Sequence, residues 1–385
     1  MTNKKEALIL LGEKVDKQWL NEQMNHIVAR LKSNMKRYQL QFPSACATQG
    51  KYRIKANDDW TNGFWTGMLC LAYEWTGEKA FLELIDKNVK SFQDRLDQHF
   101  VLDHHDIGFL YSLSAGAAYK ITKKESDRLT FLQAADVLVA RYHEKGQFIQ
   151  AWGKYGDAKE YRLIIDSILN LPLLLMATEL SGEERYAEIA KSHYKTLLKT
   201  IFRDNFSTYH TYYFDVKTGA PLQGATHQGN SHQSTWARGQ SWAILGIPLI
   251  ESYLGSDKLP DFYSKVVSVF IDNLPEDLIP YWDFDFTDAN SSAKDSSAAA
   301  IVACGLLEAE KLKSYPDAKK IAKGLIYQLG EKYTNWTDKE NEGLLQHGVY
   351  AYAEGKGIDE PNLWGDYFYF EALMRLVKPD WHRYW

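Results

Sequence analysis

The sequence has few cysteines and lacks any long apolar run. Its three cysteines, Cys46, Cys70 and Cys304, are odd in number, scattered and in no C-x-x-C arrangement, so they predict neither a disulfide framework nor a metal site. The apolar stretch near residue 10 is too short for a signal peptide, and no later run approaches the roughly 20 residues of a membrane-spanning helix. We therefore expect a cytoplasmic protein that does not interact with a membrane.

Several motifs of nucleotide and hydrolase chemistry are missing as well. The chain contains no P-loop, no dinucleotide-binding fingerprint and no G-x-S-x-G nucleophile motif. Its 45 Lys and Arg and 50 Asp and Glu are spread evenly and give a net charge of −5, which argues against the clustered basic face that nucleic acid requires. A small anionic ligand remains compatible with this balance, because one or two buried Arg or Lys side chains can neutralise a carboxylate.

Aromatic residues, in contrast, are plentiful. The 385 residues include 12 Trp and 24 Tyr, and 45% of the chain is hydrophobic, which indicates a globular protein with a large core. A large core accounts for most of these rings. A surplus of flat apolar rings also suits a sugar-binding cleft, because the C–H faces of a pyranose stack on them.

A repeated pair of helices organises the chain. One member of each pair is apolar almost all round, and the predicted segments of this kind are residues 60–76, 106–121, 166–180, 236–254, 294–312 and 364–377. The other member has an apolar stripe on one face and many Lys and Glu, as predicted for residues 16–36, 79–96, 125–142, 183–201, 261–274 and 317–333. No linker separates the pairs, so we expect one domain over residues 1–385.

This alternation predicts an all-α fold, an (α/α)6 barrel of six inner and six outer helices. A helix that is apolar all round must be buried, while its partner covers it with one face and meets water with the other. An open solenoid of helical hairpins uses the same unit. Ring closure is favoured because the last apolar segment, rich in Trp, Tyr and Phe, needs a cover that the first helix can supply.

The inner helices of such a ring run in one direction, so their N-terminal ends gather at one mouth. Long irregular segments precede several of them, at residues 148–161, 205–234, 278–292 and 335–362. Long connections in a compact domain are usually functional. This end of the barrel is therefore the expected active-site face.

Two aspartates, Asp106 and Asp166, stand at the mouth-side starts of inner helices. Either could simply cap its helix, because Asp is a favoured N-cap residue. Two such carboxyls facing one lumen would also form the acid and base pair that glycosidic chemistry uses. Asp295 and Asp366 occupy similar positions in later repeats, so position alone does not select the pair.

Candidate ligand-binding side chains cluster near these aspartates. Trp152 precedes Asp166, and His210 follows the next outer helix. Further candidates stand around the start of the fourth inner helix, namely Gln228, Trp236, Arg238, Gln240 and Trp242. Arg238 could pair bidentately with a substrate carboxylate, or it could be a buried arginine bonded to carbonyl oxygens or to another acid.

Five histidines, at positions 104, 105, 210, 227 and 232, raise the question of a metal. His227 and His232 are five residues apart in a loop, and no acid stands at a recognised ligand spacing. We therefore expect no metal and no cofactor.

Four stretches of the sequence resemble the unsaturated glucuronyl hydrolases, glycoside hydrolase family 88. They are His-His-Asp-Ile-Gly-Phe at 104–109, Arg-Leu-Ile-Ile-Asp-Ser-Ile-Leu-Asn-Leu-Pro at 162–172, the segment 228–242 ending in Trp-Ala-Arg-Gly-Gln-Ser-Trp, and Trp-Gly-Asp-Tyr-Phe-Tyr-Phe-Glu-Ala-Leu at 364–373. The resemblance extends over most of the chain, and the family fold is an (α/α)6 barrel.

The resemblance implies an activity. These enzymes remove the 4,5-unsaturated uronic acid that polysaccharide lyases leave at non-reducing ends, and they do so by hydrating the vinyl ether double bond. The aspartate matching Asp166 protonates C4 and activates the water that adds at C5, while the one matching Asp106 assists. The resulting hemiketal opens and releases the next sugar.

The resemblance also implies the substrate contacts. Residues matching His210, Gln228, Arg238 and Trp242 contact the sugar and its carboxylate. Trp60, Trp152 and Trp236 are the expected walls, and His105 and Lys356 are expected further contacts. The expected partner is an oligosaccharide with an unsaturated uronate, and the enzyme is expected to be a monomer or a homodimer.

The sequence departs from the family at one pattern. Members that prefer sulfated glycosaminoglycan disaccharides carry S-x-x-S-x-K before the last inner helix, whereas this chain has Ala351, Glu354 and Lys356. Because Glu354 would repel a sulfate, we expect chondroitin- or hyaluronan-type disaccharides without sulfate as substrates.

Three alternative functions fit the same barrel. An unsaturated rhamnogalacturonyl hydrolase would act on pectin fragments by the same chemistry. A non-catalytic sugar-binding barrel would have lost one aspartate, and both are present. A sugar epimerase would rest on a pair of histidines, which the Asp pair argues against.

Overall fold

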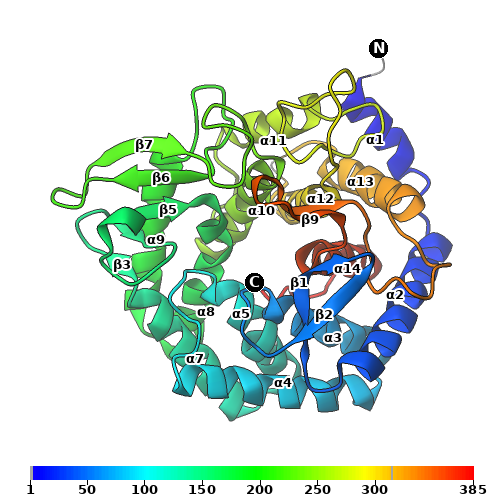
Figure 1. Ribbon diagram of the computed structural model, residues 1–385, viewed down its shortest axis with the longest axis horizontal. Helices are drawn as coiled ribbons and strands as arrows, with labels where there is room; N and C mark the ends of the chain where they lie inside the picture. Colours follow the sequence, from blue (N-terminus) through cyan, green and yellow to red (C-terminus); the bar gives the residue numbers. More distant parts are fainter. Residues whose placement is uncertain (1–2, 314) are drawn as a thin grey trace.

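The computed structural model describes residues 3–313 and 315–385. Within them, helices form two concentric rings around one axis (Figure 1). The inner ring consists of α3 (Asn62–Thr76), α5 (Ile107–Tyr111) continued by α6 (Ala117–Thr122), α8 (Leu171–Ser181), α10 (Ala237–Tyr253), α12 (Ser296–Lys311) and α14 (Leu363–Val377). The outer ring consists of α2 (Lys17–Tyr38), α4 (Lys79–Asp97), α7 (Glu125–Val139), α9 (Glu184–Thr200), α11 (Tyr263–Asp272) and α13 (Ala318–Lys332).

The inner ring is closed. Each inner helix packs on the next, and α14 packs on both α12 and α3, so the last inner helix meets the first. The predicted (α/α)6 barrel is thereby confirmed, and the open solenoid is wrong. In α12 every residue from Ser296 to Ala309 is buried, and Gly305 lets this helix approach α10 so closely that a Cβ there would lie 2.6 Å from the carbonyl oxygen of Ile244.

Outer helices cover this ring with a single face. In α4 the buried residues recur every three or four positions, at Phe81, Leu84, Ile85, Asn88, Val89 and Phe92. The turns between inner and outer helices follow the sequence signals, because Gly77 and Gly182 end α3 and α8 with φ values of +71° and +77°. Glycine adopts this left-handed conformation without a steric penalty.

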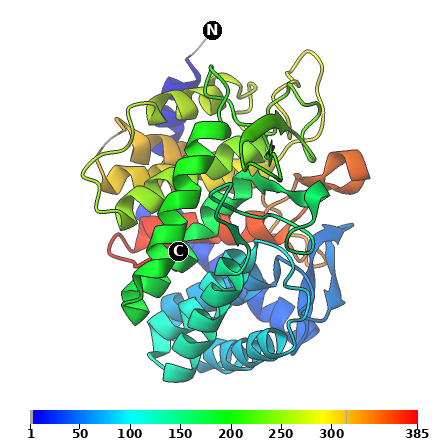
Figure 2. The ribbon, with the colours of Figure 1, turned by 90° about the vertical axis from the view of Figure 1, so that its left-hand side faces the viewer.

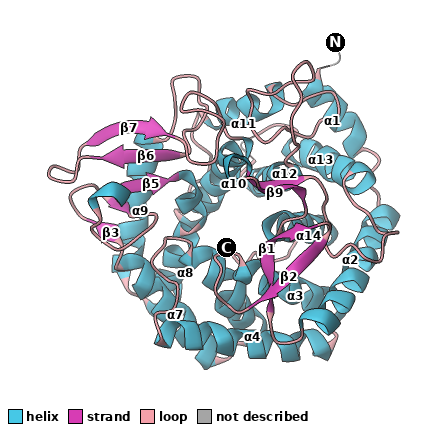
Figure 3. Cartoon of the chain, in the orientation of Figure 1, coloured by secondary structure: helices cyan, strands magenta, loops and turns pink. Residues whose placement is uncertain are grey.

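Short antiparallel strands add to the helices in the long segments before the inner helices (Figure 3). The hairpins are β1–β2 (Phe42–Thr48, Lys51–Lys55), β3–β4 (Tyr142–His143, Phe148–Ile149) and β8–β9 (Gly348–Ala351, Lys356–Glu360), and a three-stranded sheet joins β5 (Arg162–Ile164), β6 (Thr211–Phe214) and β7 (Pro221–Ala225). Figure 2 shows the strands on one side of the rings, at the inner-helix N-termini. The predicted irregular segments are thus partly hairpins.

Three further features depart from the sequence-based expectation. A short helix α1 (Lys4–Gly12) precedes α2 and packs on α13. The second inner helix contains a π-helical turn, η1 (Ser112–Gly116), and the third begins as a 3-10 turn, η3 (Ile165–Leu169), before Pro172 in the first turn of α8. No helix among the described residues is long and apolar enough to cross a membrane.

Candidate active site

Asp106 and Asp166 stand at the starts of two neighbouring inner segments. Asp106 is the residue before α5, and its carbonyl oxygen accepts the N–H of Leu110 at 3.2 Å. Asp166 lies in the 3-10 turn η3. Neither carboxyl group caps its own helix. The N-cap alternative therefore does not explain them, and both side chains are available for another role.

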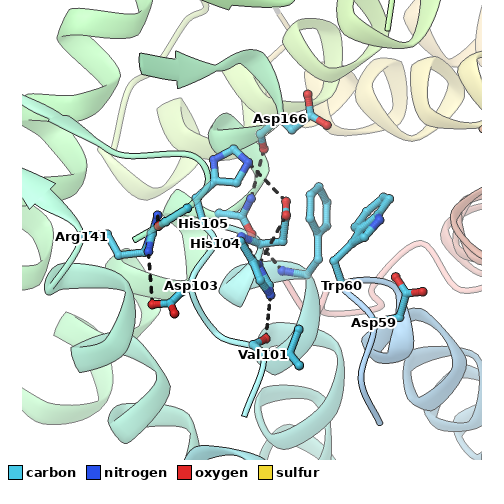
Figure 4. Close-up of polar contacts among 12 residues, drawn as sticks. Asp59, Trp60, Val101, Asp103, His104, His105, Arg141 and Asp166 are labelled. Carbon is cyan, nitrogen blue, oxygen red and sulfur yellow. Dashed lines mark hydrogen bonds and ion pairs between the residues drawn. The ribbon is translucent and has the colours of Figure 1, made fainter. Parts of the chain in front are cut away.

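Both carboxyls line one cavity of about 170 Å³ at the mouth of the barrel. Its walls also include Trp60, His105, Trp152, His227, Gln228, Arg238, Tyr350, Ala351 and Glu354. Figure 4 shows His104, His105 and Asp166 gathered beside Trp60. The cavity is smaller than the roughly 300–1,000 Å³ of drug-sized clefts, so it suits one sugar ring whose attached chain extends outside.

The carboxyl of Asp166 is the one that favours its protonated form. Burial raises the pKa of Asp166 to about 7, and the nearby negative charge of Asp106 acts in the same direction. Arg238 and the indole of Trp242 lower this pKa without offsetting burial. Within the described residues Oδ1 of Asp166 has no hydrogen-bond partner. Asp166 can therefore hold a proton near neutral pH and present it to a ligand.

Asp106 has the opposite electrostatics. Burial alone would raise the pKa of Asp106, but the imidazoles of His105 and His104 and the guanidinium of Arg141 outweigh it, so that this pKa lies below its usual value. The Nε2 atom of His105 lies 3.3 Å from Oδ1 of Asp106. Burial lowers the pKa of His105 to about 4, so its ring is neutral at pH 7. The Asp106 carboxyl is consequently ionised at pH 7, whereas the neighbouring Asp166 carboxyl can be protonated.

The two other aspartates at equivalent positions are fully engaged elsewhere. Asp295 is completely buried, with Oδ2 2.8 Å from Nη1 of Arg238, and it accepts a hydrogen bond from Ser297. Asp366 accepts the hydroxyl of Tyr52 at 2.8 Å and two backbone N–H groups. These interactions make Asp295 and Asp366 structural, and they leave Asp106 and Asp166 as the pair that faces the cavity.

Arg238 lies in the cavity wall, but its hydrogen bonds go mainly to the protein. Besides Asp295, it donates to the carbonyl oxygens of Val349 and Tyr350. Its guanidinium is sandwiched between Trp236 at 4.4 Å and Trp364 at 4.8 Å from the ring centroids. The structure thus has the buried pairing with another acid, which was one of the two sequence-based interpretations. The charge itself still borders the cavity.

The predicted tryptophans divide into two layers. Trp60 and Trp152 line the cavity. The ring of Trp60 stacks on Trp364, and its Nε1 donates to the hydroxyl of Tyr350 at 2.8 Å. Trp236 and Trp242 lie behind the wall, 3% and 0% exposed. Trp242 packs on Phe109, which contacts Trp60, and Trp236 packs on His210, which contacts Trp152.

His210 is a fixed hydrogen-bond donor behind the cavity. Its Nδ1 accepts the backbone N–H groups of His227 and Gln228, at 2.9 and 3.1 Å. Because burial lowers the pKa of His210 well below its usual value, the ring is neutral and its proton must lie on Nε2. The same two hydrogen bonds place Gln228 in the cavity wall.

The cavity rim combines the loop before α10 with the β8–β9 hairpin. Oε1 of Glu354 lies 3.2 Å from Nε2 of His227, and both side chains are about half exposed, at 50% and 46%. Lys356 lies outside the cavity lining, with its Nζ 4.0 Å from the ring centroid of Tyr350. Tyr350 was not singled out from the sequence, since a lone Tyr in a loop gives no distinguishing signal.

Two other features of the described residues bear on site assignment. A larger hollow of about 800 Å³ lies at the opposite end of the barrel, among Lys120, Tyr253 and the segment 378–385. Asp106 and Asp166 line the smaller cavity and not this hollow, so the smaller cavity is the candidate active site. No group of three His, Cys, Asp or Glu side chains in the described chain could hold a metal ion.

The sequence and the fold of this chain are similar to those of known proteins of one family. The model for Glycosyl Hydrolase Family 88 matches residues 33–371. The chain is 43% identical over 374 residues to an unsaturated chondroitin disaccharide hydrolase of Streptococcus pneumoniae, covering 96% of this chain and 94% of that protein. A crystal structure of unsaturated glucuronyl hydrolase from Streptococcus agalactiae superimposes with a TM-score of 0.92 at 40% identity, covering 96% and 94%.

A mutant of the Streptococcus agalactiae enzyme has also been solved as a complex with dGlcA-GalNAc6S. This structure superimposes with a TM-score of 0.83 at 37% identity and covers 95% of this chain and 93% of that one.

The proton on Asp166 makes the stability of the protein depend on pH. An unfolded aspartic acid loses its proton near pH 4, whereas folded Asp166 keeps it until about pH 7. The folded state binds more protons in this window, so stability falls as pH rises through it, by up to about 4 kcal/mol. Asp166→Asn should remove this contribution, because an amide does not ionise, while buried Asp366, whose pKa is also raised to about 7, keeps its own.

Urea unfolding at pH 4.5 and pH 8 measures the effect. The stability difference between Asp166→Asn and the wild type should be small at pH 4.5 and should grow in favour of the variant at pH 8. Asp103→Asn serves as a control because the Asp103 carboxyl is 66% exposed. An Asp166→Asn difference that is equal at both pH values would contradict a raised pKa.

Proposed function

The chain belongs to glycoside hydrolase family 88, and we propose on this premise that it releases 4,5-unsaturated glucuronic acid from the non-reducing end of lyase-generated glycosaminoglycan oligosaccharides. Chondroitin- and hyaluronan-type disaccharides are the proposed substrates. The observation that carries the proposal is the pair of carboxyls in one cavity, of which Asp166 has a pKa raised to about 7 while that of Asp106 is lowered. An acid of this kind is suited to general acid catalysis near neutral pH.

The reaction follows from these protonation states. Protonated Asp166 delivers its proton to C4 of the vinyl ether, and positive charge develops at C5 and the ring oxygen. The ionised carboxylate of Asp106 stabilises that charge electrostatically. The carboxylate now formed on Asp166 takes a proton from a water that adds to C5. The resulting hemiketal opens, the bond to the neighbouring sugar breaks, and Asp166 is again protonated.

The cavity wall supplies the binding groups. Trp60 and Trp152 offer apolar faces for a sugar ring, and Gln228 and His105 offer hydrogen bonds. His210 acts from behind the wall, where its Nδ1 accepts the backbone N–H of Gln228 and holds that residue in place. Arg238 places a positive charge beside the substrate carboxylate while remaining paired with Asp295. Trp236 and Trp242 act from behind the wall. Lys356 contributes only at the rim, where the next sugar would lie.

We further propose that the enzyme works in the cytoplasm, as a monomer or as a homodimer with independent sites. Cys46, Cys70 and Cys304 are all buried free thiols, which suits a reducing compartment.

Loss of the ultraviolet absorbance of the 4,5 double bond on incubation with lyase-generated disaccharides tests the activity. Asp166→Asn should lower kcat by at least about 10³-fold, because the amide cannot donate or accept the transferred proton. The fold should be unchanged, as judged by circular dichroism. A variant that keeps a near-normal rate would refute the role of Asp166, and absorbance that no such disaccharide changes in the wild type would refute the activity.

The rim predicts a preference among substrates. Glu354 places a half-exposed carboxylate at the cavity mouth, so a sulfate on the second sugar should be repelled. We expect kcat/KM to be higher for unsulfated than for sulfated chondroitin disaccharides. Glu354→Ser should raise kcat/KM for the sulfated substrate by about 5- to 10-fold, since removing a repulsion of about 1 kcal/mol has an effect of this size.

Asp359→Ser is the matched control for this comparison. Asp359 is an exposed acid of the same hairpin, it pairs with His347, and it does not line the cavity. Its replacement should leave the ratio of the two kcat/KM values unchanged. A wild-type enzyme that strongly prefers the sulfated disaccharide would overturn the assignment of Glu354.

A further inference from the structure

Asn170 joins the two segments that carry Asp106 and Asp166. Its side chain is only 1% exposed. Its Oδ1 accepts the backbone N–H of Phe109, in the first turn of α5, at 3.0 Å. Its Nδ2 donates to the backbone carbonyl oxygen of Asp166 at 3.3 Å. A side-chain amide holds acceptor and donor in one rigid plane, so this one residue links both backbones at a fixed distance.

Gly108 allows this link to be short. A Cβ at position 108 would lie 2.5 Å from Cα of Asn170 and 2.7 Å from its Oδ1. Such distances are far inside van der Waals contact, so any side chain at position 108 would force α5 away from Asn170. The absence of a side chain there lets the first turn of α5 rest directly on the end of η3.

The η3 end of the link is itself anchored to the outer ring. Nδ1 of His193, in α9, accepts the backbone N–H of Ile149 at 2.8 Å, so its proton lies on Nε2. That Nε2 donates to Oγ of Ser167 at 2.7 Å. The backbone N–H of Asn170 donates to the carbonyl oxygen of Ser167 at 2.9 Å. Because these hydrogen bonds hold η3 in place, the Asn170 side chain sets the position of α5 relative to η3.

We propose that Asn170, together with Gly108, is a positioning pair that sets the separation and orientation of the Asp106 and Asp166 carboxyls. Neither residue lines the cavity, so neither is a catalytic residue. The inference rests on the proposed function, because it assigns a reason for the spacing of the two aspartates in that reaction.

A change in spacing would alter the protonation of Asp166. The charged and titratable groups around η3 are Asp106 and His105 from the α5 start, Arg238 from α10, His193 from α9 and His210 beside β6. All three histidines are neutral, since burial lowers their pKa values, that of His105 to about 4 and that of His193 to about 3. Moving Asp106 away therefore removes the neighbouring negative charge and leaves Arg238 in place. The pKa of Asp166 would fall.

Kinetics of Asn170→Ala and Gly108→Ala test the proposal. Each variant should lower kcat by about 10- to 100-fold, because small misplacements of catalytic groups are costly. KM should change by less than about threefold, since the cavity wall is retained. The alkaline limb of the pH dependence of kcat should move to lower pH. A purely structural role would lower the melting temperature without these kinetic changes.

Two matched variants control for loss of stability. Asn88→Ala removes a buried amide that donates to Thr66 at 3.1 Å, remote from the cavity. Gly324→Ala places a Cβ 2.0 Å from the carbonyl oxygen of Leu8, a similar backbone clash between α13 and α1. Both should lower the melting temperature while leaving kcat and the pH profile unchanged. If Gly108→Ala does not fold, the comparison of kcat and of the pH profile between Asn170→Ala and Asn88→Ala tests the proposal alone.

The outcomes separate this inference from the proposed function. Suppose Asp166→Asn abolishes activity while Asn170→Ala keeps the wild-type kcat and pH profile. The positioning role is then wrong and the proposed function stands. A wild-type enzyme inactive on every unsaturated disaccharide would overturn both. A fall in kcat with unchanged KM and a shifted alkaline limb, absent from the controls, supports the pair.

Discussion

The proposed reaction depends on the electrostatic difference between two neighbouring carboxyls in one cavity. Burial raises the pKa of Asp166 to about 7, and its Oδ1 has no hydrogen-bond partner in the part of the chain that the structure describes, so the carboxyl keeps its proton. Asp106 lies between two imidazoles and near Arg141, so it ionises. The charge on Asp106 then helps to retain the proton on Asp166. An exposed pair of aspartates could not hold a proton at neutral pH, because water would stabilise both charges.

Other buried groups of the barrel maintain this difference in protonation. Of the four aspartates at helix starts, Asp106 and Asp166 face the cavity, whereas the other two bind within the protein. Asp295 forms an ion pair with Arg238, and Asp366 accepts hydrogen bonds from Tyr52 in β2 and from the backbone N–H groups of Leu344 and Leu345. Pairing Arg238 with Asp295 also limits how strongly its charge can lower the pKa of Asp166. The Trp236 and Trp364 rings on either side of the guanidinium keep that charge in place.

Much of this architecture could be predicted from the sequence, because the alternation of all-apolar and one-face-apolar helices has one compact solution once the ring closes. The same pattern placed Asp106 and Asp166 at one mouth. It could not show that Arg238 is already paired or that Trp242 lies behind the cavity wall, since both depend on contacts between distant segments. Tyr350, Asn170 and the 3-10 start at Asp166 were missed for the same reason. Their roles arise from neighbours that no local pattern specifies.

The most direct test of the central claim is a titration of the aspartate carboxyls by NMR of protein labelled with 13C at Asp Cγ. The account predicts a resonance that titrates near pH 7, that disappears in Asp166→Asn, and that titrates at lower pH in Asp106→Asn. If the resonance lost in Asp166→Asn instead titrates below pH 5 in the wild type, Asp166 is ionised at neutral pH and cannot be the acid that the mechanism requires.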